Sequence, residues 1–154
     1  MIHPVTLIRS TPGHPDFQLL VNELDRDLAI RNGEANNFFV QFNRTTDIPF
    51  TIVAYIDQLP VGCGAMKPFA SGKMEIKRMF VRSEFRGRGI ARQILSSLET
   101  WAGELAMQAC VLETGDKMPE AIALYTRSGY AVIPNYGPYA DVASSLCFEK
   151  KLGI

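Results

Sequence analysis

The segment of residues 73–93, KMEIKRMFVRSEFRGRGIARQ, constrains the fold more than any other part of the chain. Residues 75–81 combine β-branched, aromatic and long apolar side chains, a composition typical of a strand. Arg86-Gly87-Arg88-Gly89 follows, and a helical pattern of apolar residues begins directly afterwards. Because glycine has no Cβ, two glycines separated by one residue allow a sharp turn and a close approach of the main chain to a ligand. A strand, a glycine loop and a helix N-terminus in this order predict a site for a phosphate or pyrophosphate.

The charge of this segment favours the same interpretation. Seven basic and two acidic residues lie between positions 73 and 92, in a chain whose formal net charge is zero. Such a local excess of positive charge would attract a polyphosphate ligand to this end of the molecule. A solvated basic turn beside an ordinary glycine loop would have the same composition, and charge alone does not decide between the two.

Two motifs together resemble a known family. Arg86-x-x-Gly89-x-Ala91, between a strand and a helix, resembles the (Gln/Arg)-x-x-Gly-x-(Gly/Ala) signature of the GNAT superfamily of acetyl-CoA-dependent N-acetyltransferases. Residues 121–130, AIALYTRSGY, are similar to the helix and strand that complete the CoA site in that family. The resemblance covers the C-terminal half of the chain, whereas the N-terminal half matches only in its order of elements. It implies acetyl-CoA as co-substrate and no metal.

A length of 154 residues suits one domain with a sizeable core, so we expect a single domain over residues 1–154. Apolar patterns predict that this domain is α/β (α+β). Asp57-Gln58-Leu59-Pro60 predicts a tight turn between two antiparallel strands. The order of elements agrees with a GNAT-like central sheet of six or seven strands, mixed and mostly antiparallel, with helices on both faces. Residues 34–47 contain three phenylalanines that we expect to cover the core, or alternatively to line a substrate entrance. The expected strands are residues 5–9, 50–56, 60–68, 75–81, 109–113, 130–133 and 144–150. One helix is expected to begin at residue 15 and to stop at residues 32–33, a second to span residues 91–105, and a third to begin at residue 119 and to stop at residue 129.

The resemblance also implies roles for individual residues. It makes Tyr125 the general acid that protonates the departing CoA thiolate, for which a phenol of pKa about 10 is suited. It makes Glu75 the general base, acting through water. A half-buried structural tyrosine, and a glutamate paired with a neighbouring lysine, are the alternatives. The resemblance further implies that acetyl-CoA contacts the strand at Met79, Phe80 and Val81, the loop and helix start at Arg86, Gly87, Arg88, Gly89, Ile90, Ala91 and Arg92, and the helix residue Tyr125.

The amine acceptor is less constrained than the acyl donor. Residues 134–141 form a turn-rich loop in which we expect two exposed tyrosines, and acidic and aromatic residues are available around it. Such groups suit a small cationic amine or an amino-acid-like acceptor, although peptide N-termini and lysines fit as well. Met118 departs from the family, which often has an asparagine there that binds the pantetheine arm. The expected acceptor-binding residues are Glu34, Tyr136, Tyr139 and Asp141.

Composition limits other functions. Only two histidines occur, so a histidine-based metal site or a serine or cysteine triad has little to be built from. No apolar run reaches the length of a membrane span and no leader pattern opens the chain, so we expect a cytoplasmic protein. Three cysteines without a C-x-x-C spacing indicate buried thiols. We expect a monomer or homodimer, in which an exposed final strand could pair with a partner.

Three other functions have some support in the sequence. Gly87-x-Gly89 imitates a dinucleotide-binding fingerprint, but Arg92 stands where the third glycine should be. A non-catalytic acyl-CoA binding module would share every feature except Tyr125 and Glu75. Nucleic-acid binding has poor support from one Arg-Gly repeat in a neutral chain.

Overall fold

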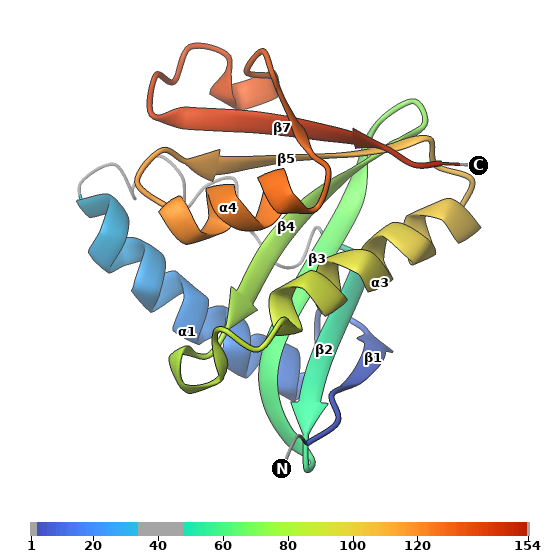
Figure 1. Cartoon of the computed structure of the whole chain (residues 1–154), viewed down its shortest axis with the longest axis vertical. Helices are drawn as coiled ribbons and strands as arrows, with labels where there is room; N and C mark the ends of the chain where they lie inside the picture. Colours follow the sequence, from blue (N-terminus) through green and yellow to red (C-terminus); the bar gives the residue numbers. More distant parts are fainter. Residues whose placement is uncertain (1–2, 34–47, 154) are drawn as a thin grey trace. The chain divides into compact units, whose positions relative to one another are not determined.

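The computed structural model describes residues 3–33 and 48–153, and within them seven strands are hydrogen-bonded in the order β1-β2-β3-β4-β5-β7-β6 (Figure 1). The parallel pair is β4 with β5, whereas β1 with β2, β2 with β3, β5 with β7 and β6 with β7 are antiparallel. The expected mixed, mostly antiparallel sheet is therefore confirmed. The strands are β1 (Thr6–Ser10), β2 (Phe50–Ile56), β3 (Leu59–Ala70), β4 (Lys73–Val81), β5 (Ala109–Gly115), β6 (Ala131–Ile133) and β7 (Ser145–Lys151).

Three α-helices and two short 3-10 helices join the described strands. All three α-helices were expected: two of them begin at the predicted residue, and the third is shifted by one residue from the predicted range. The 3-10 helices were not expected, because a single tight turn leaves no periodic pattern in the sequence. The helices are α1 (Pro15–Asn32), α3 (Ile90–Glu104) and α4 (Pro119–Arg127), with η3 (Ser83–Phe85) and η4 (Gly137–Tyr139).

Two sequence expectations differ from the structure. The turn between β2 and β3 contains only Asp57 and Gln58, both with positive φ, and Leu59 already belongs to β3. The final strand β7 lies between β5 and β6, so the expectation of an exposed final strand is wrong. Position along the chain gives no information on position in the sheet, which explains the second error.

Backbone contacts group the chain into two compact units, each made of two segments. Unit 1 comprises Met1–Lys67 and Lys77–Leu98, and unit 2 comprises Pro68–Ile76 and Glu99–Ile154. The boundaries pass through β3, β4 and α3, so each unit is discontinuous in sequence. The single domain expected over residues 1–154 stays a prediction.

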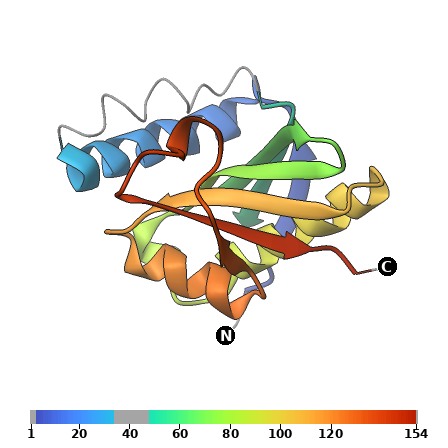
Figure 2. The same ribbon diagram turned by 90° about the horizontal axis from the view of Figure 1, so that it is seen from above.

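In unit 1, α1 and α3 lie on opposite faces of β2 and β3 (Figure 2). The buried side chains of β3 alternate accordingly, since Cys63 and Ala65 join the core under α1. Gly64 faces α3, and a Cβ there would lie 2.7 Å from Ile94 Cγ2. The helix can therefore approach the strand only because this residue has no side chain. The core under α1 contains Phe17, Leu20, Val21, Leu24, Ile48, Val53, Cys63, Ala65 and Phe80.

In unit 2, β5 pairs with β4 over Lys73–Glu75 and with β7 along its whole length. The helix α4 lies on one side of β5 and β7, and the loop that contains η4 lies on the other side (Figure 2). The strands of unit 2 thus have a helix-covered face and a loop-covered face. Among the helices that the structure describes, none is long and apolar enough to span a membrane.

Candidate active site

The glycine loop of unit 1 has the backbone that its sequence predicts. Gly87 and Gly89 have φ of 79° and 78°, in the left-handed region that residues with a Cβ adopt at a cost. A Cβ built on either residue would have no atom within 4 Å, so the space beside the loop is open. The main chain here is accessible to a ligand, as close contact with a pyrophosphate requires.

The helix α3 begins directly after this loop. Ile90 is buried and fixes the start of the helix, whereas Arg92 is exposed and Ala91 is half-buried. The Gln93 N–H donates to the Gly89 carbonyl at 3.1 Å. The N–H groups of residues 90–92 lie in the first turn of the helix, where no acceptor within the helix is available to them. The helix dipole adds positive potential at the same place. This end of α3 can therefore stabilise an anion.

Part of the basic charge of residues 73–92 is used inside the protein. The Arg82 guanidinium binds both carboxylate oxygens of Glu23, at 3.0 and 2.7 Å. Arg78 pairs with Asp25, and Lys73 Nζ lies 3.0 Å from a carboxylate oxygen of Glu149. Internal partners therefore neutralise part of the local positive excess, and the sequence does not show which of the basic residues find such partners. The exposed basic residues of the loop and helix start are Arg86, Arg88 and Arg92.

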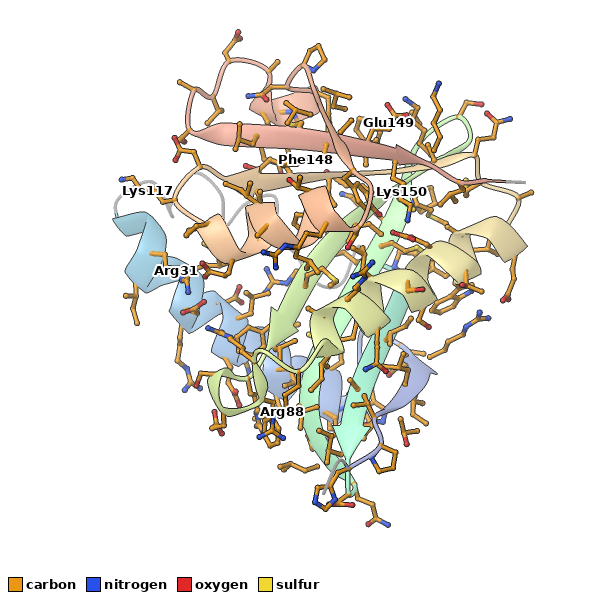
Figure 3. All side chains as sticks on the ribbon, viewed as in Figure 1. Arg31, Arg88, Lys117, Phe148, Glu149 and Lys150 are labelled. Atoms are coloured by element: carbon orange, nitrogen blue, oxygen red, sulfur yellow. The ribbon has the colours of Figure 1, made fainter. Side chains whose placement is uncertain are left out.

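Arg86 and Arg88 also stabilise the loop itself. Arg86 Nε donates to the Val81 carbonyl at 2.8 Å, and its guanidinium carbon lies 5.7 Å from the centre of the Phe80 ring. The guanidinium carbon of Arg88, labelled in Figure 3, lies 5.2 Å from the Phe85 ring centre. These contacts tie the loop to the end of β4 and to η3 through favourable cation–π geometry.

Glu75 lies on the loop-covered face of unit 2. Its side chain is buried, and one carboxylate oxygen accepts a hydrogen bond of 2.7 Å from the Tyr136 hydroxyl. Register places it beside Val111 of β5, which in turn pairs with Glu149 of β7. Paired residues share a face of a sheet, so these three side chains lie on the same side.

The two tyrosines of the loop are not exposed, contrary to expectation. Tyr139 is buried and Tyr136 is half-buried. The Tyr136 ring packs on Phe69 at 4.6 Å and on Tyr139 at 5.9 Å between ring centres. The Asn135 side chain donates to the main-chain carbonyls of Val142 in the loop and of Ser145 at the start of β7, each at 3.0 Å, and so holds the loop against the strands. A Pro-Asn-Tyr-Gly-Pro sequence predicts a turn but does not show which face of a sheet it will cover.

Carboxylates near these tyrosines raise their pKa values. Burial, followed by the charge of Glu75 and the hydrogen bond to it, raises the pKa of Tyr136. Burial and then the charges of Glu113 and Glu75 raise the pKa of Tyr139. Glu113 accepts a hydrogen bond of 2.6 Å from Ser145 Oγ and was not among the predicted site residues. A carboxylate within a mostly apolar strand is the signal that could have indicated it.

Tyr125 lies on the helix-covered face of unit 2. It is buried on α4, with its ring centre 6.1 Å from that of Phe148 and 5.9 Å from that of Tyr130. Burial, and then the charge of Glu113, raise the pKa of the Tyr125 phenol, so it keeps its proton at neutral pH. Phe148 and Glu149 are consecutive on β7 (Figure 3) and therefore face opposite sides. The two predicted catalytic residues, Tyr125 and Glu75, thus lie on opposite faces of these strands.

The remaining predicted residues have varied positions. Met79 is half-buried, and Phe80 and Val81 are buried, at the end of β4. Asp141 is exposed on the loop of unit 2, and Glu34 lies outside the described residues. Met118 precedes α4 and makes no side-chain hydrogen bond to the helix start. Within residues 3–33 and 48–153, no cluster of three or more histidine, cysteine, aspartate or glutamate side chains could hold a metal ion.

Comparisons with known proteins agree with this arrangement. The model of the Acetyltransferase (GNAT) family matches residues 17–130. The chain is 37% identical over 151 residues to the IAA acetyltransferase of Azospirillum brasilense, covering 96% of this chain and 98% of that protein. A crystal structure of a Klebsiella pneumoniae protein has a TM-score of 0.80 at 28% identity, covering 97% of this chain and 98% of the other.

A more distant relative shares the fold. The PaiA N-acetyltransferase of Thermoplasma acidophilum, solved in complex with coenzyme A, has a TM-score of 0.74 at 16% identity, covering 96% of this chain and 99% of the other. The family model covers most of this chain, and the similarity to the Azospirillum enzyme extends over nearly its whole length. The chain therefore belongs to the GNAT acetyltransferase family and is an acyltransferase.

Proposed function

We propose that the protein transfers an acetyl group from acetyl-CoA to the primary amine of a small molecule, directly and within a ternary complex. The observation that carries this proposal is the loop of Gly87 and Gly89, whose left-handed backbone faces open space at the start of α3. Family membership and a structural relative solved with coenzyme A support the same donor. The main chain of residues 86–92 would bind the pyrophosphate, with Arg86, Arg88 and Arg92 adding positive charge.

The proposed chemistry needs an oxyanion site, an acid and a base. The neutral amine attacks the thioester carbonyl carbon, a C–N bond forms, and the main-chain N–H groups of Met79–Val81 stabilise the oxyanion. When the C–S bond breaks, its electron pair leaves with sulfur, and Tyr125 donates a proton to that thiolate. The amine proton passes through water to Glu75. The Tyr125 phenol is protonated at neutral pH and so has a proton to donate, whereas its raised pKa makes it a weaker acid than a free phenol and leaves its position beside the sulfur to favour the transfer.

The acceptor is proposed to be a cationic amine that loses its proton at the site. Support comes from the loop-covered face of unit 2, where Glu75 lies next to Tyr136, and Tyr136 lies against Phe69 and Tyr139. A carboxylate together with aromatic rings attracts an ammonium group. Phe69 is 39% exposed, so an acceptor can reach this aromatic group. Asp141 is proposed to add negative charge for the acceptor, as is Glu34, which lies outside the described residues.

The test is release of CoA thiol from acetyl-CoA across a panel of amines, amino acids, polyamines and short peptides. We expect turnover with at least one amine, and we expect Glu75→Gln and Tyr125→Phe each to reduce it by about a hundredfold, a usual contribution of acid–base catalysis. An enzyme that binds acetyl-CoA but turns over equally well with either substitution would refute both proposed roles. Binding of acetyl-CoA without turnover of any amine would favour the alternative of a non-catalytic acyl-CoA binding module.

A further inference from the structure

We infer that Arg78 is a positioning residue, which orients the main chain of Met79–Val81 for acetyl-CoA, with Asp25 of α1 as its anchor. All of these residues belong to unit 1. The inference rests on the proposed function, because it takes the N–H groups of Met79–Val81 as the donors to the thioester. The inference is about the side chains that fix the direction of these N–H groups, and not about the contact of the N–H groups with acetyl-CoA.

The first observation is a backbone outlier inside a strand. Arg78 has φ of 60° within β4, in the left-handed region that only glycine adopts without cost. The other described residues with positive φ that are not glycine are Asp57 and Gln58, in a hairpin turn, and Ala106, after the end of α3. Turns and helix ends commonly have this conformation, whereas a strand does not. Strained residues of this kind persist only where their surroundings hold them, and they concentrate at functional sites.

The second observation is what holds the Arg78 side chain. The side chain is 1% exposed, and its terminal nitrogen Nη2 lies 2.5 Å from Asp25 Oδ1 and 3.4 Å from the Val21 carbonyl, both on α1. Its Nε is buried, and none of the described residues accepts a hydrogen bond from it. Burying a guanidinium with an unpaired N–H is costly, so an apolar side chain would serve stability at least as well. The ion pair is better explained as an anchor than as a source of stability.

The third observation concerns the peptide group between Arg78 and Met79. The buried Cys63 thiol donates to the Arg78 carbonyl at 3.4 Å. Burial raises the pKa of Cys63 to about 12, so the thiol keeps the proton that it donates. A trans peptide group is planar, with its N–H opposite its carbonyl. Fixing the Arg78 carbonyl on the side of Cys63 therefore directs the Met79 N–H to the other side. The side chain and the carbonyl of Arg78 together determine the direction of a proposed oxyanion donor.

The experiment compares two substitutions at position 78 that alter stability and backbone preference in opposite ways. Arg78→Met removes the anchor but fills most of the buried volume and keeps a Cβ, so it should be the more stable variant and should relax away from positive φ. Arg78→Gly leaves a cavity but readily adopts positive φ. We therefore expect acetyl-CoA affinity, measured by isothermal titration calorimetry, to fall about tenfold in Arg78→Met and only about threefold in Arg78→Gly. The melting temperatures should follow the opposite order.

A second pair of variants tests the anchor without changing β4. Asp25→Asn should weaken acetyl-CoA binding about threefold. The matched control is Asp27→Asn, which removes the carboxylate that pairs with Arg31 on the same helix at 3.4 Å and should leave the affinity unchanged. Asn keeps the size of the Asp25 side chain and an oxygen that can accept a hydrogen bond from Arg78, but the buried guanidinium loses its counter-ion, so the melting temperature of Asp25→Asn is measured together with its affinity.

The outcomes separate this inference from the proposed function. Tight acetyl-CoA binding by the native protein, with affinity unchanged in both Asp25→Asn and Arg78→Met, would overturn the role of Arg78 alone. Affinity that follows melting temperature, with Arg78→Gly the weaker binder, would also overturn it, because the effect would then be one of stability. A native protein that does not bind acetyl-CoA would instead overturn the proposed donor site.

Discussion

The hydrogen bond from the Tyr136 hydroxyl to Glu75 should affect both stability and catalysis. Its length is 2.7 Å, Glu75 is 5% exposed, and Tyr136 is half-buried, so the bond is protected from water. A hydrogen bond to a charged group contributes about 1.5–3 kcal/mol, and one between neutral groups about 1 kcal/mol. We expect Tyr136→Phe to lower the free energy of unfolding by about 2 kcal/mol in the native background and by about 1 kcal/mol in a Glu75→Gln background.

The assay is urea unfolding of the two single variants and the double variant, with kcat/KM for the amine measured on the same proteins. A coupling of about 1 kcal/mol between the two substitutions would show that Tyr136 acts on the Glu75 charge. Tyr136→Phe should also lower kcat/KM by about tenfold or more while acetyl-CoA affinity stays the same. Tyr55→Phe is the matched control, because that hydroxyl donates to Asp16 at 2.6 Å in the other unit; it should cost stability but not activity.

An equal loss of unfolding free energy for Tyr136→Phe in the native and in the Glu75→Gln background would mean that the carboxylate charge plays no part in the bond. An equal loss of activity in Tyr136→Phe and Tyr55→Phe would mean that the loss follows from lower stability and not from the orientation of Glu75.

Three other predictions can be checked with the same preparations. Gly89→Ala should weaken acetyl-CoA binding about tenfold in titration calorimetry, because alanine adopts a φ of 78° only at a cost in free energy. The control Gly103→Ala, at a position in α3 where a Cβ has equally open space, should bind acetyl-CoA normally. Equal affinities of the two variants would show that the glycine loop is not part of the acetyl-CoA site. Tyr125→Phe should reduce kcat about a hundredfold at unchanged acetyl-CoA affinity, and a normal rate would exclude it as the acid. Burial raises the pKa of Cys63 and of Cys110 to about 12 from 9.0, so their thiols contribute stability that is complete below pH 9 and is lost as pH rises from 9 towards 12. Between about pH 9 and 10.5, each buried thiol should make the free energy of unfolding decrease by about 1.4 kcal/mol more per pH unit. Cys63→Ala should remove the contribution of one thiol to this slope. The same slope in the native protein and in Cys63→Ala would contradict the raised pKa of Cys63.

Most helix and strand boundaries could be predicted from the conformational preferences of individual residues, above all proline and glycine. The helix α1 starts at Pro15 and ends before Gly33 because proline fits the first helical turn and glycine adopts the positive φ of 56° that follows it. The glycine loop was predictable for the same reason, since Gly87 and Gly89 occupy left-handed conformations. The tertiary position of β7 was not, because strand order depends on contacts that a sequence pattern does not contain.

The candidate site was predictable only where a motif specifies the backbone. The sequence indicated Glu75 and Tyr125 through the family resemblance, but it could not show that they lie on opposite faces of the strands in unit 2. It also gave no sign that Tyr136 binds Glu75, because that contact joins residues 61 positions apart. Arg78 was counted among the charges available to a ligand, whereas its side chain is buried against α1. Burial of a charged residue depends on its tertiary partner, here Asp25.

The most direct test of the central claim is mass spectrometry of the products formed from acetyl-CoA and the best amine of the panel. The account predicts free CoA and an equal amount of amine that has gained one acetyl group on nitrogen, both strongly reduced in Tyr125→Phe. Release of CoA without an acetylated amine would contradict it, as would accumulation of acetylated enzyme as an intermediate, because direct transfer in a ternary complex produces neither.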